Sequence, residues 1–169
     1  MHGEVAGDQV RFRRPCPACG AAAVADGGQA LIGGRLEWSI ETDCPACGPV
    51  LACGRAGMPA ELRRRLLAEG AHGPVRLELD GAVRPAVVMK VLRAELALDL
   101  AGARAALAEL RAGRYTGTLA EVAYLVAAFG AVGAGARAVR ARDCGSRHGV
   151  GERGAVAEGL SGGSGADRP

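Results

Sequence analysis

The chain has 169 residues and a net charge of +3, and its length suits one ordinary domain or two small ones. Apolar residues make up 49% of the chain but aromatic residues only 3%, so a core must be built from Ala, Val and Leu. A net charge this small argues against a protein that binds chiefly to phosphates, and no apolar run reaches the ~18–20 residues of a membrane span. Because the sequence also shows no signal-peptide pattern, we expect a cytoplasmic protein whose thiols stay reduced.

Two copies of the pentapeptide CPACG, at 16–20 and 44–48, are the clearest chemical signal in the sequence. They supply two C-x-x-C pairs: Cys16, Cys19, Cys44 and Cys47. Each pair suits a tight turn whose backbone amides point at the sulfur atoms, and Gly20 and Gly48 supply the permissive backbone that such a turn needs. Two pairs at this spacing are typical of four thiolates around one Zn²⁺, a closed site that stabilises a fold and leaves no position for substrate.

The segment between the two pairs has the pattern of short antiparallel strands. Residues 26–28, DGG, predict a turn. Residues 35–42, RLEWSIET, predict a strand, because apolar and polar side chains alternate there. Together with the cysteine pairs, this pattern resembles the zinc-ribbon family over about residues 14–55, and it predicts a zinc-ribbon module at 1–57.

A redox dithiol is the second interpretation of the cysteine pairs. A thioredoxin-type C-x-x-C needs one pair, placed between a strand and a helix of a larger sheet, whereas two pairs flank strand-like segments here. Two further cysteines stand outside the pairs. Cys53 is either a substitute metal ligand or a thiol packed beside the ribbon. Cys144 lies among glycine, serine and arginine. His148 is nearby, but these two residues alone do not predict a metal site.

A connecting helix is expected within residues 58–73. Pro59 suits its first turn, where the missing N–H costs nothing, and Gly70 marks its end. Its apolar face is formed by three leucines: Leu62, Leu66 and Leu67. The three consecutive arginines at 63–65 predict a solvated face, with an anionic contact on RNA or protein as the alternative. Residues 143–169 are rich in glycine and serine, and we expect them to form a disordered tail.

Residues 74–142 have the pattern of one compact unit. The expected elements are a strand at 75–79, a helix opened by Pro85, a helix capped by Asp99, a short strand at 113–117, a helix with a Thr118–Glu121 capping box, and a strand at 136–140. The whole chain is therefore expected to be α+β, with a small N-terminal zinc ribbon followed by a domain that contains a three-stranded antiparallel sheet.

The stretch VVMKVLRAELALDLAGARAAL at 87–107 carries a second resemblance. It is similar to the C-terminal domain of the bacterial ribosomal stalk protein, in which a K-x-x-R helix is followed by an L-x-L joint and a helix with a basic residue. The matching residues are Lys90, Arg93, Leu98, Leu100, Ala103 and Arg104. The protease adaptor ClpS resembles the same fold.

The stalk resemblance implies a docking face for translation GTPases. That face would comprise one apolar contact and three basic side chains: Met89, Lys90, Arg93 and Arg104. The alternative is that Lys90 and Arg93 belong to an ordinary solvated helix face, because exposed charge needs no special explanation.

No catalytic set is evident in the sequence. Its histidines, His2, His72 and His148, lie in loops or near the termini, and no phosphate-binding loop, nucleophile elbow or H-E-x-x-H motif occurs. We therefore expect a non-enzymatic zinc protein that acts as a protein-interaction module, with a translation GTPase or a ribosome component as its partner. The alternative functions are a nucleic-acid-binding zinc ribbon and, less favoured, a thiol oxidoreductase. Nucleic acid is disfavoured because the ribbon is slightly acidic and has one aromatic side chain, Trp38.

Overall fold

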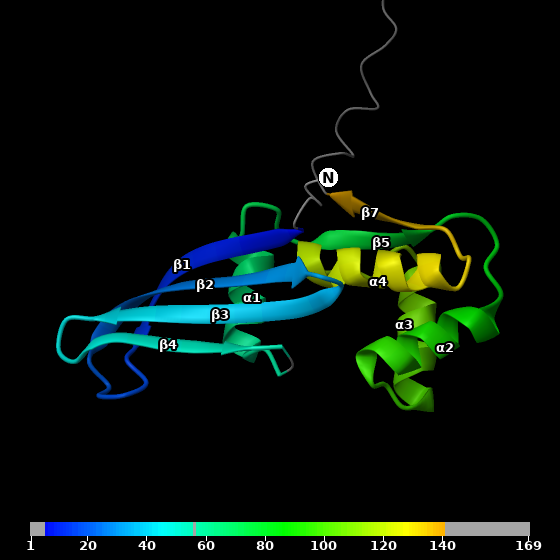
Figure 1. Cartoon of the computed structure of the whole chain (residues 1–169). Helices are drawn as coiled ribbons and strands as arrows, with labels where there is room; N and C mark the ends of the chain where they lie inside the picture. Colours follow the sequence, from blue (N-terminus) through cyan, green and yellow to red (C-terminus); the bar gives the residue numbers. More distant parts are fainter. Residues whose placement is uncertain (1–5, 56, 141–169) are drawn as a thin grey trace, which may run out of the picture.

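The computed structural model describes residues 6–55 and 57–140, and it has the α+β architecture expected from the sequence (Figure 1). The N-terminal part, here called the sheet module, comprises β1 (Gly7–Pro15), β2 (Ala22–Ile32), β3 (Arg35–Cys44), β4 (Gly48–Gly54) and α1 (Ala60–Glu69). The second part, the mixed module, comprises β5 (Val75–Leu79), α2 (Pro85–Leu96), α3 (Leu100–Arg111), β6 (Thr116–Gly117), α4 (Leu119–Ala131) and β7 (Ala136–Arg140). The expected C-terminal tail, with Cys144 and His148, lies outside the described residues, as does His2. None of the described helices has the length and apolar character needed to cross a membrane.

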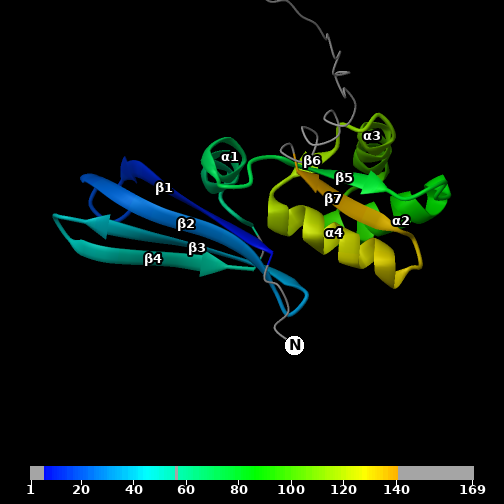
Figure 2. The ribbon, with the colours of Figure 1, turned by 90° about the horizontal axis from the view of Figure 1, so that it is seen from above.

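The sheet module is an antiparallel meander whose strands lie in the order β1-β2-β3-β4. Figure 2 shows α1 lying along one side of this sheet. A small core lies between the sheet and α1, and its members are Val10, Phe12, Ala25 and Ile40 of the sheet with Leu62 and Leu66 of α1. Because successive residues of a strand point to opposite sides, the exposed charged residues that alternate with this core lie on the other side of the sheet.

The turn predicted at residues 26–28 was wrong. These residues lie inside β2, and the chain reverses at Gly33 and Gly34, whose φ angles are +55° and +76°. A Cβ atom on Gly27 would lie 2.6 Å from Cδ1 of Leu62. Glycine therefore occupies residue 27 because α1 packs closely on β2, and this contact is not visible in a local turn pattern.

The mixed module has the predicted order strand, helix, helix, strand, helix, strand, and its antiparallel sheet has the strand order β6-β5-β7. Its core comprises Val75, Leu77, Val88, Val91, Leu92, Leu110, Leu119, Val122, Leu125, Phe129 and Ala134. Both predicted helix caps are present. Asp99 accepts a hydrogen bond of 2.7 Å from a backbone amide of α3, and Thr118 and Glu121 form a capping box at the start of α4.

The three consecutive arginines of α1 do not share one solvated face. Arg63 forms an ion pair with Glu121 of α4, and the Arg65 guanidinium lies over the Phe12 ring at 5.4 Å from its centre. Of the three, Arg64 alone is exposed over the whole residue, and Arg63 and Arg65 are half-buried. The predicted solvated face is therefore present only in part: the Arg63 and Arg65 side chains remain 43% and 37% exposed, but Arg63 also binds the mixed module and Arg65 also contacts β1.

The two modules contact each other directly. Helix α4 packs near β1, β2 and β3, and the Thr118 hydroxyl at its N-terminus donates a 2.5 Å hydrogen bond to Oε1 of Gln29 in β2. At the connection between the modules, Asp8 accepts hydrogen bonds from the backbone amides of Ala71 and His72 at 3.0 and 3.1 Å. The position of the mixed module is therefore fixed by polar contacts as well as by the connecting chain.

Candidate metal centre

Four cysteine thiols meet at one end of the sheet module. Cys16 follows β1 and Cys44 ends β3, so each C-x-x-C pair occupies a hairpin turn. The two turns share one end of the sheet because β1 and β3 run in the same direction in the meander. The Sγ atoms of Cys16 and Cys47 are 3.5 Å apart, and those of Cys19 and Cys44 are 3.6 Å apart. All four sulfur atoms lie within 4.8 Å of one another.

These separations suit a tetrahedral metal site. With metal–sulfur bonds of about 2.3 Å, sulfur atoms at the corners of a tetrahedron are about 3.8 Å apart. Zn²⁺ is the ion that a set of four thiolates fits best, since it accepts tetrahedral sulfur coordination without a redox change. These two short sulfur contacts join one C-x-x-C pair to the other, and all four cysteines are free of disulfides, which also suits a shared ion better than a C-x-x-C disulfide.

The first turn directs backbone amides at its sulfur. The amides of Ala18 and Cys19 lower the pKa of the Cys16 thiol to about 6, because hydrogen bonds from N–H groups stabilise the thiolate. The pKa of Cys47 is raised by its hydrogen bonds with the sulfur atoms of Cys16, Cys19 and Cys44. The cluster without metal therefore retains protons that a bound cation would displace.

The glycines that follow each pair have the conformation predicted for them. Their φ angles are +77° at Gly20 and +87° at Gly48, in the left-handed region where a side chain is strained. The apolar cluster at this end of the sheet is small and consists of Cys16, Ala23 and Cys44 with Ala21 and Val50 beside them. Because so few atoms bury little apolar surface, a metal bound by the four thiolates would supply much of the stability of this end of the sheet.

The remaining described cysteine does not belong to the centre. Cys53 lies on β4 opposite Ser39, exposed and free, and it is not a member of the four-cysteine group. The possibility that Cys53 substitutes for a ligand is therefore wrong for this structure. Register explains this, because Cys53 faces the side of the sheet opposite α1, several residues from the turn that holds the ligands.

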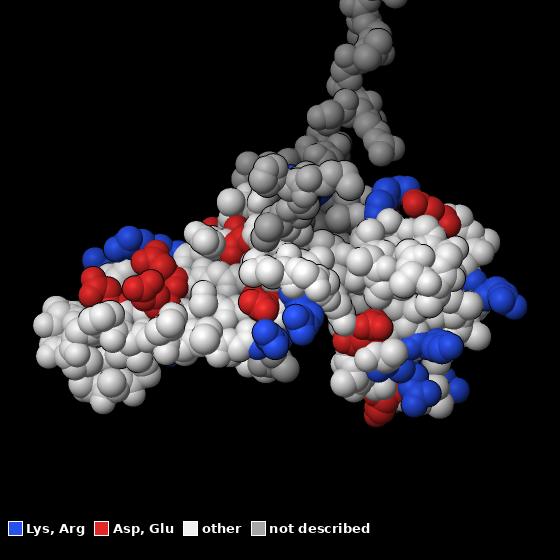
Figure 3. Space-filling model, viewed as in Figure 1, with Lys and Arg blue, Asp and Glu red and all other residues white. Residues whose placement is uncertain are grey.

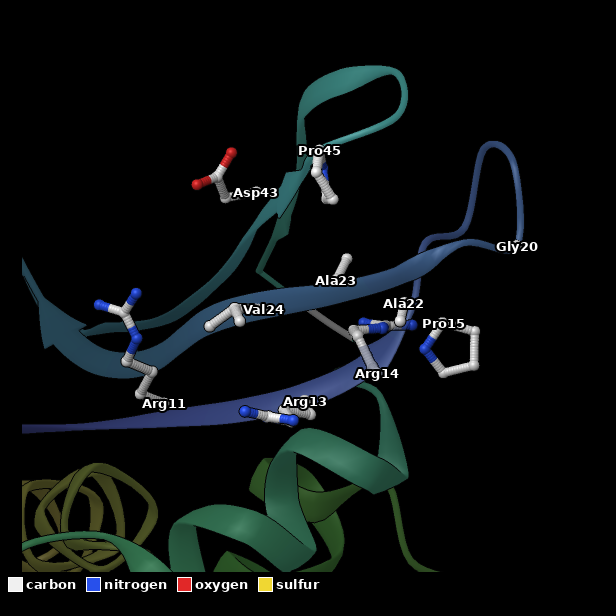
Figure 4. Close-up of a pocket in the computed structure, with 10 residues that line it drawn as sticks. All are labelled: Arg11, Arg13, Arg14, Pro15, Gly20, Ala22, Ala23, Val24, Asp43 and Pro45. Carbon is white, nitrogen blue, oxygen red and sulfur yellow. The ribbon is translucent and has the colours of Figure 1, made fainter.

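A groove of about 710 Å³ lies beside the metal centre (Figure 4). Its cationic side chains are Arg11, Arg13 and Arg14 of β1, and Figure 4 shows Asp43 and Pro45 on the opposite side of the groove. Two of the arginines have distant carboxylate partners, Arg11 with Asp26 at 3.7 Å and Arg14 with Glu61 at 3.9 Å. These carboxylates offset much of the positive charge of the groove.

The residues implied by the stalk resemblance lie on α2 and α3. Lys90, Arg93 and Arg104 are exposed, and Met89 is half-buried. Lys90, Arg93 and Met89 line a shallow groove of about 590 Å³. Its other lining residues also come from α2 and from the short segment between α2 and α3. Arg104 lies on α3 and does not line this groove.

Comparisons of the chain with protein-family models, with curated proteins and with solved structures found no match. The class of this protein is therefore described from its fold and its cysteine geometry alone. They define an α+β protein with a four-cysteine cluster, set in an antiparallel sheet and consistent with a zinc-ribbon-like site.

The sequence patterns did not predict a cleft that lies between the two modules. Its lining includes Trp38 of β3, Met58, Leu96 at the end of α2 and Tyr124 of α4. These residues are far apart in the sequence, and each fits an ordinary strand or helix pattern. The one signal that could have indicated the cleft is Trp38, the only tryptophan of an aromatic-poor chain.

Proposed function

We propose that the chain is a non-catalytic zinc-binding adaptor. In this proposal one Zn²⁺ stabilises the hairpin turns of the sheet module, and the exposed face of α2 and α3 docks a protein partner. A catalytic role for the zinc is disfavoured because four thiolates fill its tetrahedral coordination and leave no position for substrate.

The observation that carries the docking role is the groove along α2. Lys90 and Arg93 lie exposed at its rim, and neither has an ion-pair partner within residues 6–55 and 57–140. Met89 offers an apolar surface between them. Two exposed cations without an ion-pair partner among the described residues, beside an apolar side chain, suit an acidic partner surface.

The partner class rests on the sequence resemblance to the ribosomal stalk domain. We propose a translation GTPase, with Arg104 of α3 as a third basic contact. The element order of the mixed module supports this proposal, because it is the order expected for the domain that the resemblance covers.

Binding to a purified bacterial elongation GTPase tests the proposal. The double substitution Lys90→Glu with Arg93→Glu should weaken binding by about tenfold or more, because it reverses charge at the interface. It should change the free energy of unfolding by only about 0.5 kcal/mol per site, as is usual for exposed residues. Arg111→Glu, an exposed arginine at the end of α3, is the matched control. A wild-type protein that does not bind, or a double variant that binds equally well, would contradict the proposed partner.

A second candidate function is nucleic-acid binding by the groove of Figure 4. The observation that favours it is the presence of three arginines of β1, Arg11, Arg13 and Arg14, in the lining of this groove. Fluorescence anisotropy with single-stranded RNA in a salt series tests it. Arg13→Glu should then weaken binding and reduce the salt slope by about 1.

A further inference from the structure

We propose that the cleft between the two modules binds an extended, acidic peptide segment of a protein partner. The cleft has a volume of about 600 Å³. Figure 3 shows it as a notch between the modules, bordered by both basic and acidic side chains. It is separate from the groove along α2 and does not depend on the function proposed for that groove.

The cleft offers an apolar surface of a kind that ligands use. Its apolar and aromatic lining residues are Leu36, Trp38, Met58, Leu96 and Tyr124, all half-buried. Binding sites form preferentially between domains, where apolar and aromatic side chains meet a few polar groups. This lining includes the only tryptophan and one of the two tyrosines of the chain.

The two acidic side chains of the cleft are already bonded within the chain. Glu121 accepts two hydrogen bonds from Arg63, and Glu95 accepts one from the Tyr124 hydroxyl. Their oxygen atoms are therefore poorly available to a basic ligand, because a ligand would have to displace these donors.

Two of the three arginines that line the cleft, Arg35 and Arg55, have N–H groups that are free to bind a ligand. Arg35 is exposed and has no ion pair within the described residues. Arg55 contacts Glu37 through Nε alone, at 3.2 Å, and its side chain is 66% exposed. Guanidinium groups with unused N–H donors bind carboxylates well, often through two parallel hydrogen bonds. The cleft is thus complementary to a ligand that carries carboxylates.

An open strand edge indicates that this ligand is an extended peptide. On one side, residues 35–37 of β3 pair with β2. On the other side β4 ends at Gly54, opposite Trp38, so within the described ranges residues 35–37 have no strand partner there. A peptide can add to such an edge as a further strand, and its backbone then supplies hydrogen bonds that a compact small molecule lacks.

The geometry of a strand sets the expected sequence of the peptide. Arg35 and Trp38 are three positions apart on β3, so their side chains point to opposite sides of the strand. In an added strand, an apolar residue beside Trp38 and a carboxylate beside Arg35 would therefore be an odd number of positions apart. An acidic residue near Arg35 completes the match. The expected motif is therefore a short extended segment in which a bulky apolar residue and a carboxylate are close in sequence.

Selection from a random peptide library displayed on phage, with the zinc-loaded full chain as bait, tests the proposal. Synthetic versions of the enriched peptides are then titrated while Trp38 fluorescence is followed, which reports on the cleft directly because no other tryptophan is present. We expect acidic peptides with a bulky apolar residue, a change in Trp38 emission, and binding that weakens about tenfold or more in Arg35→Glu. Methylation of peptide backbone nitrogens that face β3 should weaken binding as well.

The control is Arg13→Glu, which reverses an exposed arginine of the same sheet outside the cleft. It should leave peptide affinity unchanged. Enrichment of basic peptides, enrichment of none, or affinity that depends on Arg13 and not on Arg35 would each overturn the proposal. Insensitivity to backbone methylation would overturn the added-strand geometry.

Discussion

Arg63 of α1 and Glu121 of α4 form a two-contact ion pair between the modules, with Nε–Oε1 and Nη2–Oε2 distances of 2.8 and 2.9 Å. Glu121 Oε2 also accepts a 3.1 Å hydrogen bond from the backbone amide of Thr118, and Thr118 in turn donates to Gln29. The hydrogen bonds with Glu121 raise the pKa of Arg63. One carboxylate therefore caps α4 and also connects it to α1.

The first prediction concerns the energy of this ion pair. A double-mutant cycle with Arg63→Ala and Glu121→Gln should give a coupling free energy of about 1 kcal/mol, because the contact is bidentate but partly exposed. Urea unfolding of the four proteins measures it. Arg64→Ala is the control, since Arg64 is exposed on the same helix, and it should not couple to Glu121→Gln. A coupling free energy of zero would mean that the ion pair does not hold the modules together.

The second prediction concerns the metal. Protein purified without added metal should contain about one zinc per chain, measured by elemental analysis. Acidification should release the metal, because protons compete with it for the thiolates. A protein that is metal-free and holds a reversible disulfide between Cys16 and Cys19 would favour the redox interpretation instead.

A third prediction separates the metal ligands from the other cysteine of the sheet. Cys44→Ser should abolish zinc binding and unfold the end of the sheet module that has little apolar core. Cys53→Ser should leave both unchanged, since Cys53 is exposed and outside the cluster. Amide resonances of the mixed module should remain dispersed in both variants, because its core contains none of the cysteines. Collapse of those resonances in Cys44→Ser would show that the two modules fold only together.

The fourth prediction concerns Ala97, which ends α2 with a φ angle of +51°. It is the one described residue other than glycine in this left-handed region, and a Cβ atom there is strained. Ala97→Gly should therefore stabilise the protein by about 0.5–1 kcal/mol in thermal or urea unfolding. As a control, Gly130→Ala places a Cβ in open space within α4 and should also stabilise, by about 0.5–1 kcal/mol, through helix propensity. Destabilisation by Ala97→Gly would mean that the alanine methyl group makes a contact worth more than the strain.

The fifth prediction is a pH dependence at Glu78 on β5. The guanidinium of Arg76, and after it that of Arg137, hold the pKa of Glu78 below its ordinary value. A carboxylate with a lowered folded-state pKa stabilises the protein above its unfolded pKa of about 4.3, and this contribution is lost as the pH falls through the folded-state pKa. Glu78→Gln should therefore be less stable than wild type at pH 7, by on the order of 1 kcal/mol, and the difference should shrink in acid. Urea unfolding of both proteins at several pH values measures this, and a difference that does not change with pH would contradict it.

The sequence by itself determined the local structure of this protein. Helix caps such as Asp99 and Thr118 act within one turn of their helix, so their residue types reveal them. The strand at 75–79 follows from its alternation, and the four-cysteine cluster follows from two C-x-x-C pairs at a spacing typical of a shared metal site. In each case the interacting groups are near in sequence or repeat a known motif.

The tertiary structure decided the features that depend on contacts between distant segments. Gly27 resembles a turn residue, but it lies in a strand because Leu62 packs against it. Arg63 resembles a solvated residue, but a carboxylate that follows it by 58 positions binds it. The cleft between the modules likewise exists only once β3, α2 and α4 are brought together. Packing and charge pairing between such segments depend on their arrangement in space, and neither leaves a periodic or local signal in the sequence.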